Sequence, residues 1–132
     1  MKYLLDTDTL IFWLKGNQSI EQKALDIGLE HLGYSIISKA ELFYGAYNSK
    51  NMQRNLENIN KIDQALTLVY LEETAAEWFG KLKAELKQQG NIIMDADLLI
   101  ASIAIANDLT LITNNTRHFQ RISTLKINNW SY

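Results

Sequence analysis

The sequence predicts an α/β domain in which a parallel sheet of four or five strands is covered by helices on both faces. Short apolar runs alternate along the chain with longer segments of helical periodicity. That alternation is typical of parallel sheets, whose crossover helices shield both faces. The chain has 132 residues, 47% of them hydrophobic, which suffices for one domain with a real core and is short for two. We therefore expect a single domain over residues 1–132.

The expected strands are short apolar runs bounded by polar or turn residues. They lie at residues 3–5, 34–37, 66–71 and 109–113, with a last short strand at 125–127. Each run is short enough to form a single strand of a small sheet.

The expected helices fill the segments between the strands, at residues 7–15, 19–32, 38–47, 51–64, 72–89 and 95–107. Ser19 and Ser38 stand where helix N-caps are expected, and Gly16, Gly33 and Gly90 stand where helices or helical segments should stop. The helix at 72–89 is the clearest, because large apolar side chains recur on it every four residues.

Composition and charge exclude several classes of protein. Cysteine is absent, so the sequence excludes a disulfide framework and a thiolate metal site. The first residues meet a charge too soon for a signal peptide, and the longest uncharged helical stretch covers about half of the ~20 residues that a membrane span needs. We expect a cytoplasmic protein without a membrane anchor. Because the net charge is −2, nucleic-acid binding would need a local patch of cations, for which the candidates are Lys39, Lys50, Arg54, Arg117 and Arg121.

Three acids stand just beyond apolar runs, at the predicted starts of helices. Asp6 follows the first strand, Glu41 follows the second, and Asp97 opens a helix that is otherwise uncharged. The carboxyl ends of parallel strands face one crevice, so these acids are expected to meet there. Carboxylates that meet in this way imply a divalent cation.

Each acid also has a purely structural interpretation. Asp6 would serve as a helix N-cap, Ser38 and Glu41 fit a Ser-x-x-Glu capping box, and Asp97 would favour the helix dipole with Asp95 as the cap. Helix capping alone, however, would not require a carboxylate at the same end of every strand–helix unit. The three acids together therefore favour a metal site.

Supporting residues are expected close to these acids. Asp8 lies two residues after Asp6 and faces either the same crevice or solvent. The segment 113–116 follows the fourth strand and offers neutral polar groups that suit the orientation of a carboxylate or of a metal-bound water, or else a turn and a helix cap. A lone imidazole such as His118 is expected on the surface or in packing rather than in catalysis.

Five short motifs in order resemble the PIN-domain ribonuclease toxins of the VapC type. They are Leu4-Leu5-Asp6-Thr7-Asp8, Ser38-Lys39-Ala40-Glu41-Leu42-Phe43-Tyr44-Gly45, Asp97-Leu98-Leu99-Ile100-Ala101, Thr113-Asn114-Asn115-Thr116-Arg117-His118-Phe119, and Asn129-Trp130. The resemblance runs from Met1 to Tyr132 and implies a PIN-like three-layer fold. It also implies that Asp6, Glu41 and Asp97 are the acidic metal-binding and catalytic residues, and that Asn115 occupies a fourth position that is Asp or Asn.

The resemblance further implies a type II toxin–antitoxin pair, in which the toxin cleaves RNA with Mg²⁺ or Mn²⁺ and a VapB-type antitoxin blocks it. We expect Asp6 and Asp97 to be the principal metal ligands, Glu41 to be a ligand or to orient the attacking water, and Asn115 to support them. Single-stranded RNA or structured loops, such as those of tRNA, are the expected substrates. The residues leave open which bond is cut and whether one or two ions bind.

Other functions fit parts of the sequence. Asp6-Thr7-Asp8-Thr9-Leu10 is similar to the nucleophile motif of haloacid-dehalogenase phosphatases, but Leu10 stands where that motif has Thr or Val. A receiver domain would need an acceptor Asp after the third strand, where the chain has Glu. A non-catalytic binding module of the same fold is the remaining alternative.

A homodimer is expected from the aromatic side chains. The helix at 38–47 carries Leu42, Phe43, Tyr44 and Tyr47, and the helix at 72–89 adds Trp78 and Phe79. One small domain cannot readily bury all of this surface, so we expect a second copy and an antitoxin segment to cover part of it.

Overall fold

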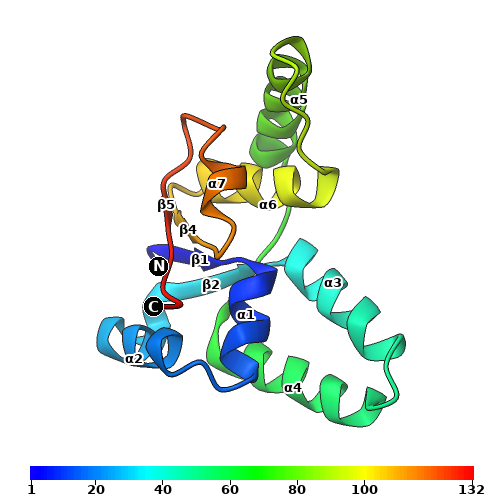
Figure 1. Ribbon diagram of the computed structural model, residues 1–132, viewed down its shortest axis with the longest axis vertical. Coiled ribbons are helices and arrows are strands. Elements are labelled where there is room, and N and C mark those ends of the chain that lie inside the picture. The colour runs from blue at the N-terminus through cyan, green and yellow to red at the C-terminus, as the bar shows by residue number, and fades with distance from the viewer.

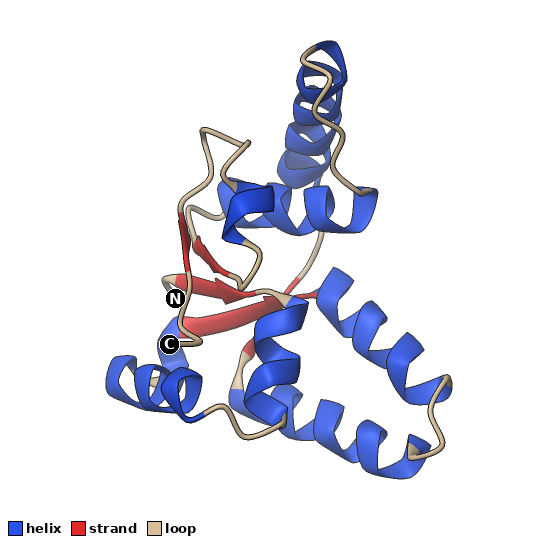
Figure 2. Ribbon diagram, viewed as in Figure 1, coloured by secondary structure: helices blue, strands red, loops and turns tan.

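The computed structural model describes residues 1–132 and contains one sheet of five parallel strands (Figures 1 and 2). The strands are β1 (Tyr3–Leu5), β2 (Leu32–Ser35), β3 (Thr67–Val69), β4 (Thr110–Ile112) and β5 (Ile127–Asn128). Their order is β3-β2-β1-β4-β5, and every neighbouring pair is parallel. The predicted parallel sheet is confirmed, with five strands.

Helices cover both faces of this sheet. They are α1 (Thr7–Leu14), α2 (Gln18–Ile27), α3 (Ile36–Tyr47), α4 (Met52–Ala65), α5 (Glu73–Gln88), α6 (Asp95–Ala106) and α7 (Thr116–Phe119), with a 3₁₀ turn η1 (Leu29–His31) before β2. Figure 1 shows α1 to α4 on one side of the sheet and α5 to α7 on the other. No helix is both long and apolar enough to cross a membrane.

Two apolar layers form the core, one on each face of the sheet. Leu4 and Leu111 point into the layer under α5, α6 and α7, whereas Leu5 and Ile112 point into the layer under α1 to α4. Successive strand residues face opposite sides, so strands of only three residues contribute to both layers. Most strand residues are accordingly apolar, as expected for a sheet that is buried on both faces.

The segment from residue 17 to residue 35 differs from the prediction. The helix begins after Asn17, whose side chain accepts a hydrogen bond from the Ile20 amide at 3.0 Å, so Ser19 is not the cap. It ends at Gly28, whose φ of +102° suits glycine and few other residues. A helix continued to Leu32, as predicted, would consume the first residue of β2.

The start of α3 also differs, and the difference removes the structural interpretation of Glu41. Ser35 is the N-cap, and its Oγ accepts a hydrogen bond from the Ser38 amide at 3.0 Å. The predicted capping box between Ser38 and Glu41 is therefore wrong. Glu41 lies beyond the first turn, where helix amides are already paired within the helix.

Asp95, the predicted N-cap of α6, does not cap that helix. Met94 stands at the N-cap position, and Asp95 lies inside the first turn, where its Oδ1 is 2.9 Å from Lys83 Nζ. The ion pair draws the Asp95 side chain toward α5. Asp95 thus forms an exposed ion pair that links α6 to α5.

Candidate active site

The switch point of the sheet lies between β1 and β4. The chain goes from β1 to β2 on one side, and later returns to place β4 on the other side of β1. Open parallel sheets bind ligands at such a point, beyond the carboxyl ends of the strands. Asp6 follows β1 and Thr113 follows β4 at this edge.

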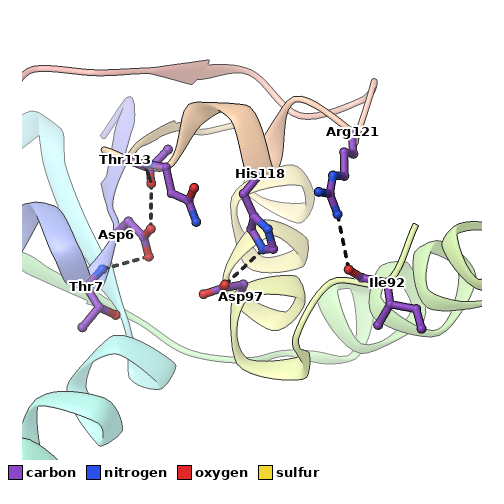
Figure 3. A network of polar contacts seen from close by, with 8 residues as sticks. Asp6, Thr7, Ile92, Asp97, Thr113, His118 and Arg121 are labelled. Atoms are coloured by element: carbon purple, nitrogen blue, oxygen red, sulfur yellow. Dashed lines mark hydrogen bonds and ion pairs between the residues drawn. The ribbon is translucent and has the colours of Figure 1, made fainter. Parts of the chain in front are cut away.

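Asp6 is held rigidly at the end of β1. Its backbone amide donates to the Ile112 carbonyl at 2.8 Å, which continues the pairing of β1 with β4. One carboxylate oxygen accepts from the Thr7 amide and the other from the Thr113 hydroxyl, both at 2.8 Å (Figure 3). Only 5% of the residue is exposed. Asp6 therefore serves as the N-cap of α1, as its structural interpretation predicted, while it also faces the crevice.

Negative charge is concentrated around Asp6. Burial first, and then the nearby Asp8 and Asp97 carboxylates, raise its pKa from 3.8 to about 7, against the hydrogen bonds from Thr113 and Thr7. The pKa of Asp8 is also raised, by burial first and then by Asp97, although the Asn114 and Thr9 hydrogen bonds oppose the rise. The fold thus brings three acids close enough for their charges to interact, and leaves them without a Lys or Arg partner.

Asp97 reaches this cluster from the first turn of α6 and meets His118 of α7 (Figure 3). His118 Nε2 lies 3.2 Å from Asp97 Oδ2, but the ring is turned so that the buried Nε2 atom completes no hydrogen bond. The His118 ring packs edge-on against Phe119, as expected, and its contact with Asp97 was not predicted. Its place in a helix directly after a strand end was the signal available in the sequence.

Glu41 joins the site through Thr7. The Thr7 hydroxyl is 2.6 Å from Glu41 Oε1 and 2.8 Å from Ser38 Oγ, while the Thr7 amide is bonded to Asp6. One hydroxyl proton serves one acceptor, so Thr7 donates to the carboxylate and accepts from Ser38. The exposed carboxylate of Glu41 is thereby fixed at the mouth of the crevice. Sequence reasoning missed this bridging role of Thr7.

The loop after β4 places Asn114 and Asn115 differently. Asn115 is exposed at the N-cap position of α7, where its side chain makes no capping hydrogen bond. Both polar atoms of the Asn114 amide are buried without a partner, and its backbone amide lies 3.3 Å from Asp8 Oδ2. The prediction for this segment was that Asn115 supports the site. The structure adds a second side-chain amide, that of Asn114, which is buried.

The donor atoms suit a hard divalent cation. No three Asp, Glu or His side chains are spaced closely enough to hold an ion by themselves. Mg²⁺, however, is usually held by one or two carboxylates and keeps several waters. The raised pKa of Asp6 and the unpartnered Asn114 amide are what a site built for a cation and its waters would show. Asp6 with one neighbouring acid, Asp8 or Asp97, and several waters therefore fits such an ion.

Comparison with known proteins matches the chain to a family. The model of the PIN domain matches residues 3–125. Ribonuclease VapC2 of Haemophilus influenzae is 35% identical over 130 residues, which are 98% of this chain and 98% of that protein. The tRNA(fMet)-specific endonuclease VapC of Shigella flexneri is 31% identical over 131 residues, with 99% of both chains covered.

Solved structures share the fold over the whole chain. A chain of VapBC2 from Rickettsia felis, crystallised with a DNA fragment from the promoter, is 34% identical with a TM-score of 0.92, and the match covers 98% of this chain and 99% of that one. A chain of VapBC from Salmonella typhimurium bound to DNA gives a TM-score of 0.93 at 32% identity, with 98% of both covered. The predicted three-layer PIN-like fold is confirmed.

Proposed function

We infer that this chain, which belongs to the PIN-domain family and within it to the VapC ribonucleases, is the endoribonuclease toxin of a toxin–antitoxin pair. The observation that carries the inference is the crowding of Asp6, Asp8 and Asp97 at the switch point of the sheet. Acids that crowd together without cationic partners weaken a fold unless a metal ion joins them, so their presence here points to metal-dependent chemistry. A phosphatase that uses Asp6 as nucleophile is not supported, because the relatives are ribonucleases.

Each acid has a separate role in the proposed mechanism. Asp6 and Asp97 would hold Mg²⁺ or Mn²⁺, with Asp8 beside them. Thr113 orients the Asp6 carboxylate by a hydrogen bond, and His118 lies in ion-pair contact with Asp97. When bound, such an ion would lower the pKa of water and neutralise charge on the phosphate. Glu41, fixed by Thr7 at the mouth of the crevice, orients the attacking water. The buried Asn114 amide and the exposed Asn115 lie beside that path.

The proposed substrate is single-stranded RNA or an RNA loop, with tRNA as the first candidate. A phosphodiester must approach carboxylates that lie at a sheet edge, which an unpaired strand does more easily than a duplex. A relative from Shigella flexneri is named as a tRNA(fMet)-specific endonuclease. We propose a cytoplasmic activity, because tRNA is found in that compartment.

The proposed protein partners are a VapB-type antitoxin and a second copy of the chain. Similar chains were solved as VapBC assemblies. On α3, Tyr44 is 71% exposed and Tyr47 is 65% exposed, and Phe12 and Leu14 of α1 are also exposed. The predicted excess of aromatic surface is thus present on α3, and a partner would cover it.

The test is cleavage of total RNA by the purified protein, with EDTA, and with Mg²⁺ or Mn²⁺ restored. We expect discrete RNA fragments that appear only with metal and only when the antitoxin is absent. Metal-independent cleavage equal to that with Mn²⁺ would exclude the proposed mechanism. Absence of cleavage in tRNA, ribosomal RNA and messenger RNA alike would exclude the function.

A further inference from the structure

A groove adjoins the candidate active site and has no role in the mechanism above. It lies between α1, α3 and α4, has a volume of about 510 Å³, and is lined at one end by Glu41. This volume is within the range of small-molecule sites and admits one or two nucleotides. Figure 1 shows α3 leaving the sheet and α4 returning toward it, with α1 beside them.

One wall of the groove is a row of amides. Asn51, Asn55 and Asn58 line it from α4, and their spacing of four and three residues places them on one face of the helix. Asn51 occupies the N-cap position, yet its side chain makes no capping hydrogen bond. Asn55 and Asn58 are half-buried, and neither of their amides is among the buried polar groups that lack a partner. The amides therefore reach solvent inside the groove, where they can form hydrogen bonds with a polar ligand.

The charges of the groove favour an anionic ligand beside Glu41. Arg54 and Lys15 line it from opposite sides, and neither forms an ion pair. A backbone phosphate bound by these cations would lie in continuity with a phosphate at the acidic centre. The floor, which includes Leu42 and Ile59, is apolar and suits the face of a base.

We propose that this groove binds the unpaired nucleotides next to the cleaved bond, and that Asn55 and Asn58 determine which bases are accepted. Asparagine amides pair with the edges of bases, and unpaired RNA exposes those edges. The amides of Asn55 and Asn58 favour RNA over an apolar peptide segment, which would leave them unsatisfied. This assignment rests on the proposed ribonuclease function, but RNA binding in the groove is measurable without cleavage.

The first experiment compares RNA binding and cut sites for the Asn55→Ala/Asn58→Ala double variant and for Asn60→Ala. Asn60 is an exposed residue of the same helix and does not line the groove. In EDTA, the double variant should lose about 10- to 100-fold in discrimination between the preferred oligonucleotide and one with an exchanged base, measured by fluorescence anisotropy. With Mn²⁺ its cut-site map on total RNA should broaden. Asn60→Ala should match the parent in both assays.

A second pair of variants fills the groove instead of removing its amides. A Cβ added at Gly45, which lines the groove, meets no atom within 4 Å, and the same holds for Gly80 on α5. Both positions therefore have room for a side chain to leave the helix, and thermal unfolding of each variant checks that it folds. Gly45→Phe should weaken RNA binding at least tenfold, whereas Gly80→Phe should leave it unchanged. If Gly45→Phe and the double variant both keep the parent's RNA affinity and cut sites, the proposal is wrong and the groove is left to a protein segment. If the parent binds RNA through the groove in EDTA but never cleaves it, the groove assignment stands and the ribonuclease function fails.

Discussion

Asp6 and Asp63 are two carboxyl groups held by hydrogen bonds, and the fold shifts their pKa values in opposite directions. Asp63 of α4 accepts from the Tyr34 hydroxyl and from Lys39 Nζ, and these two contacts lower its pKa. Asp6 is bonded by Thr7 and Thr113, but burial and the nearby Asp8 raise its pKa to about 7. The difference lies first in burial, because Asp6 is buried and Asp63 is exposed. It lies next in the neighbours, since Asp63 has Tyr34 and Lys39 whereas Asp6 has other acids.

The comparison separates a site built for stability from one built for a ligand. The Tyr34–Asp63–Lys39 network ties β2, α3 and α4 together with its charges neutralised, and Lys39 also lies 6.0 Å from the centre of the Phe43 ring. The carboxylates of Asp6, Asp8 and Asp97 instead repel one another at the crevice. Sites that bind cations commonly destabilise the free protein in this way, and the ligand restores the loss.

The largest expected effect is on activity. Asp97→Asn removes a charge without a change in volume, and should lower cleavage more than about 100-fold, beyond the loss typical of an outer-shell partner. Asp95→Asn is the matched control, because Asp95 lies in the same helical turn and is 61% exposed beside Lys83. Initial rates on an RNA oligonucleotide give the ratio. Cleavage by Asp97→Asn within threefold of the parent would remove Asp97 from the mechanism.

The next effect is stabilisation by metal. Two carboxylates about 4 Å apart repel by roughly 4 kcal/mol at an effective dielectric near 20, and a bound cation relieves that repulsion. At an ion concentration of 100 Kd the gain is about 2.7 kcal/mol, which raises the Tm by several degrees. Mn²⁺ should raise the Tm of the parent and of Asp63→Asn but not that of Asp6→Asn. An equal Tm shift in Asp6→Asn would show that Asp6 does not contribute to the binding of Mn²⁺.

The pH dependence of stability should have opposite signs at the two carboxyls. The folded Asp6 keeps its proton up to a pH of about 7 while the unfolded chain loses it near 3.8, so metal-free stability should fall as the pH rises through this window. Urea unfolding in EDTA at pH 5 and pH 8 measures the fall, and Asp6→Asn should reduce it. The lowered pKa of Asp63 means that its contribution is present above pH 3.8 and is lost at more acidic pH. A metal-free parent that is more stable at pH 8 than at pH 5 would contradict the assignment for Asp6.

The smallest effect is expected at the neutralised pair. Lys39→Ala removes an ion pair whose acid is 39% exposed, so it should cost less than about 1 kcal/mol and leave cleavage unchanged. Thermal unfolding and initial rates measured together test this. A tenfold loss of activity at unchanged stability would show that Lys39 positions Glu41, two residues further along α3.

Local patterns predicted much of the fold from sequence. The helices α1, α4, α5 and α6 lie within two residues of their predicted bounds, because their periodicity and stop signals come from neighbouring residues. The region before β2 was harder to predict. Both Asn17 and Ser19 are competent caps, and both Gly28 and Gly33 are competent stops, so only the strand that Leu32–Ser35 contributes to the sheet decides between them.

For the site, the sequence by itself determined which acids follow strands, because position along the chain fixes the carboxyl end of a strand. Asp6 was predicted as a site residue on that basis. Asp97 follows helix α5 rather than a strand, and only its place at the start of an otherwise uncharged helix indicated it. Tertiary structure alone decided the contacts of Thr7 with Glu41 and of His118 with Asp97, which join residues 34 and 21 positions apart. Such contacts depend on strand order and on the angle at which each helix leaves the sheet, and the packing of both apolar layers sets these together.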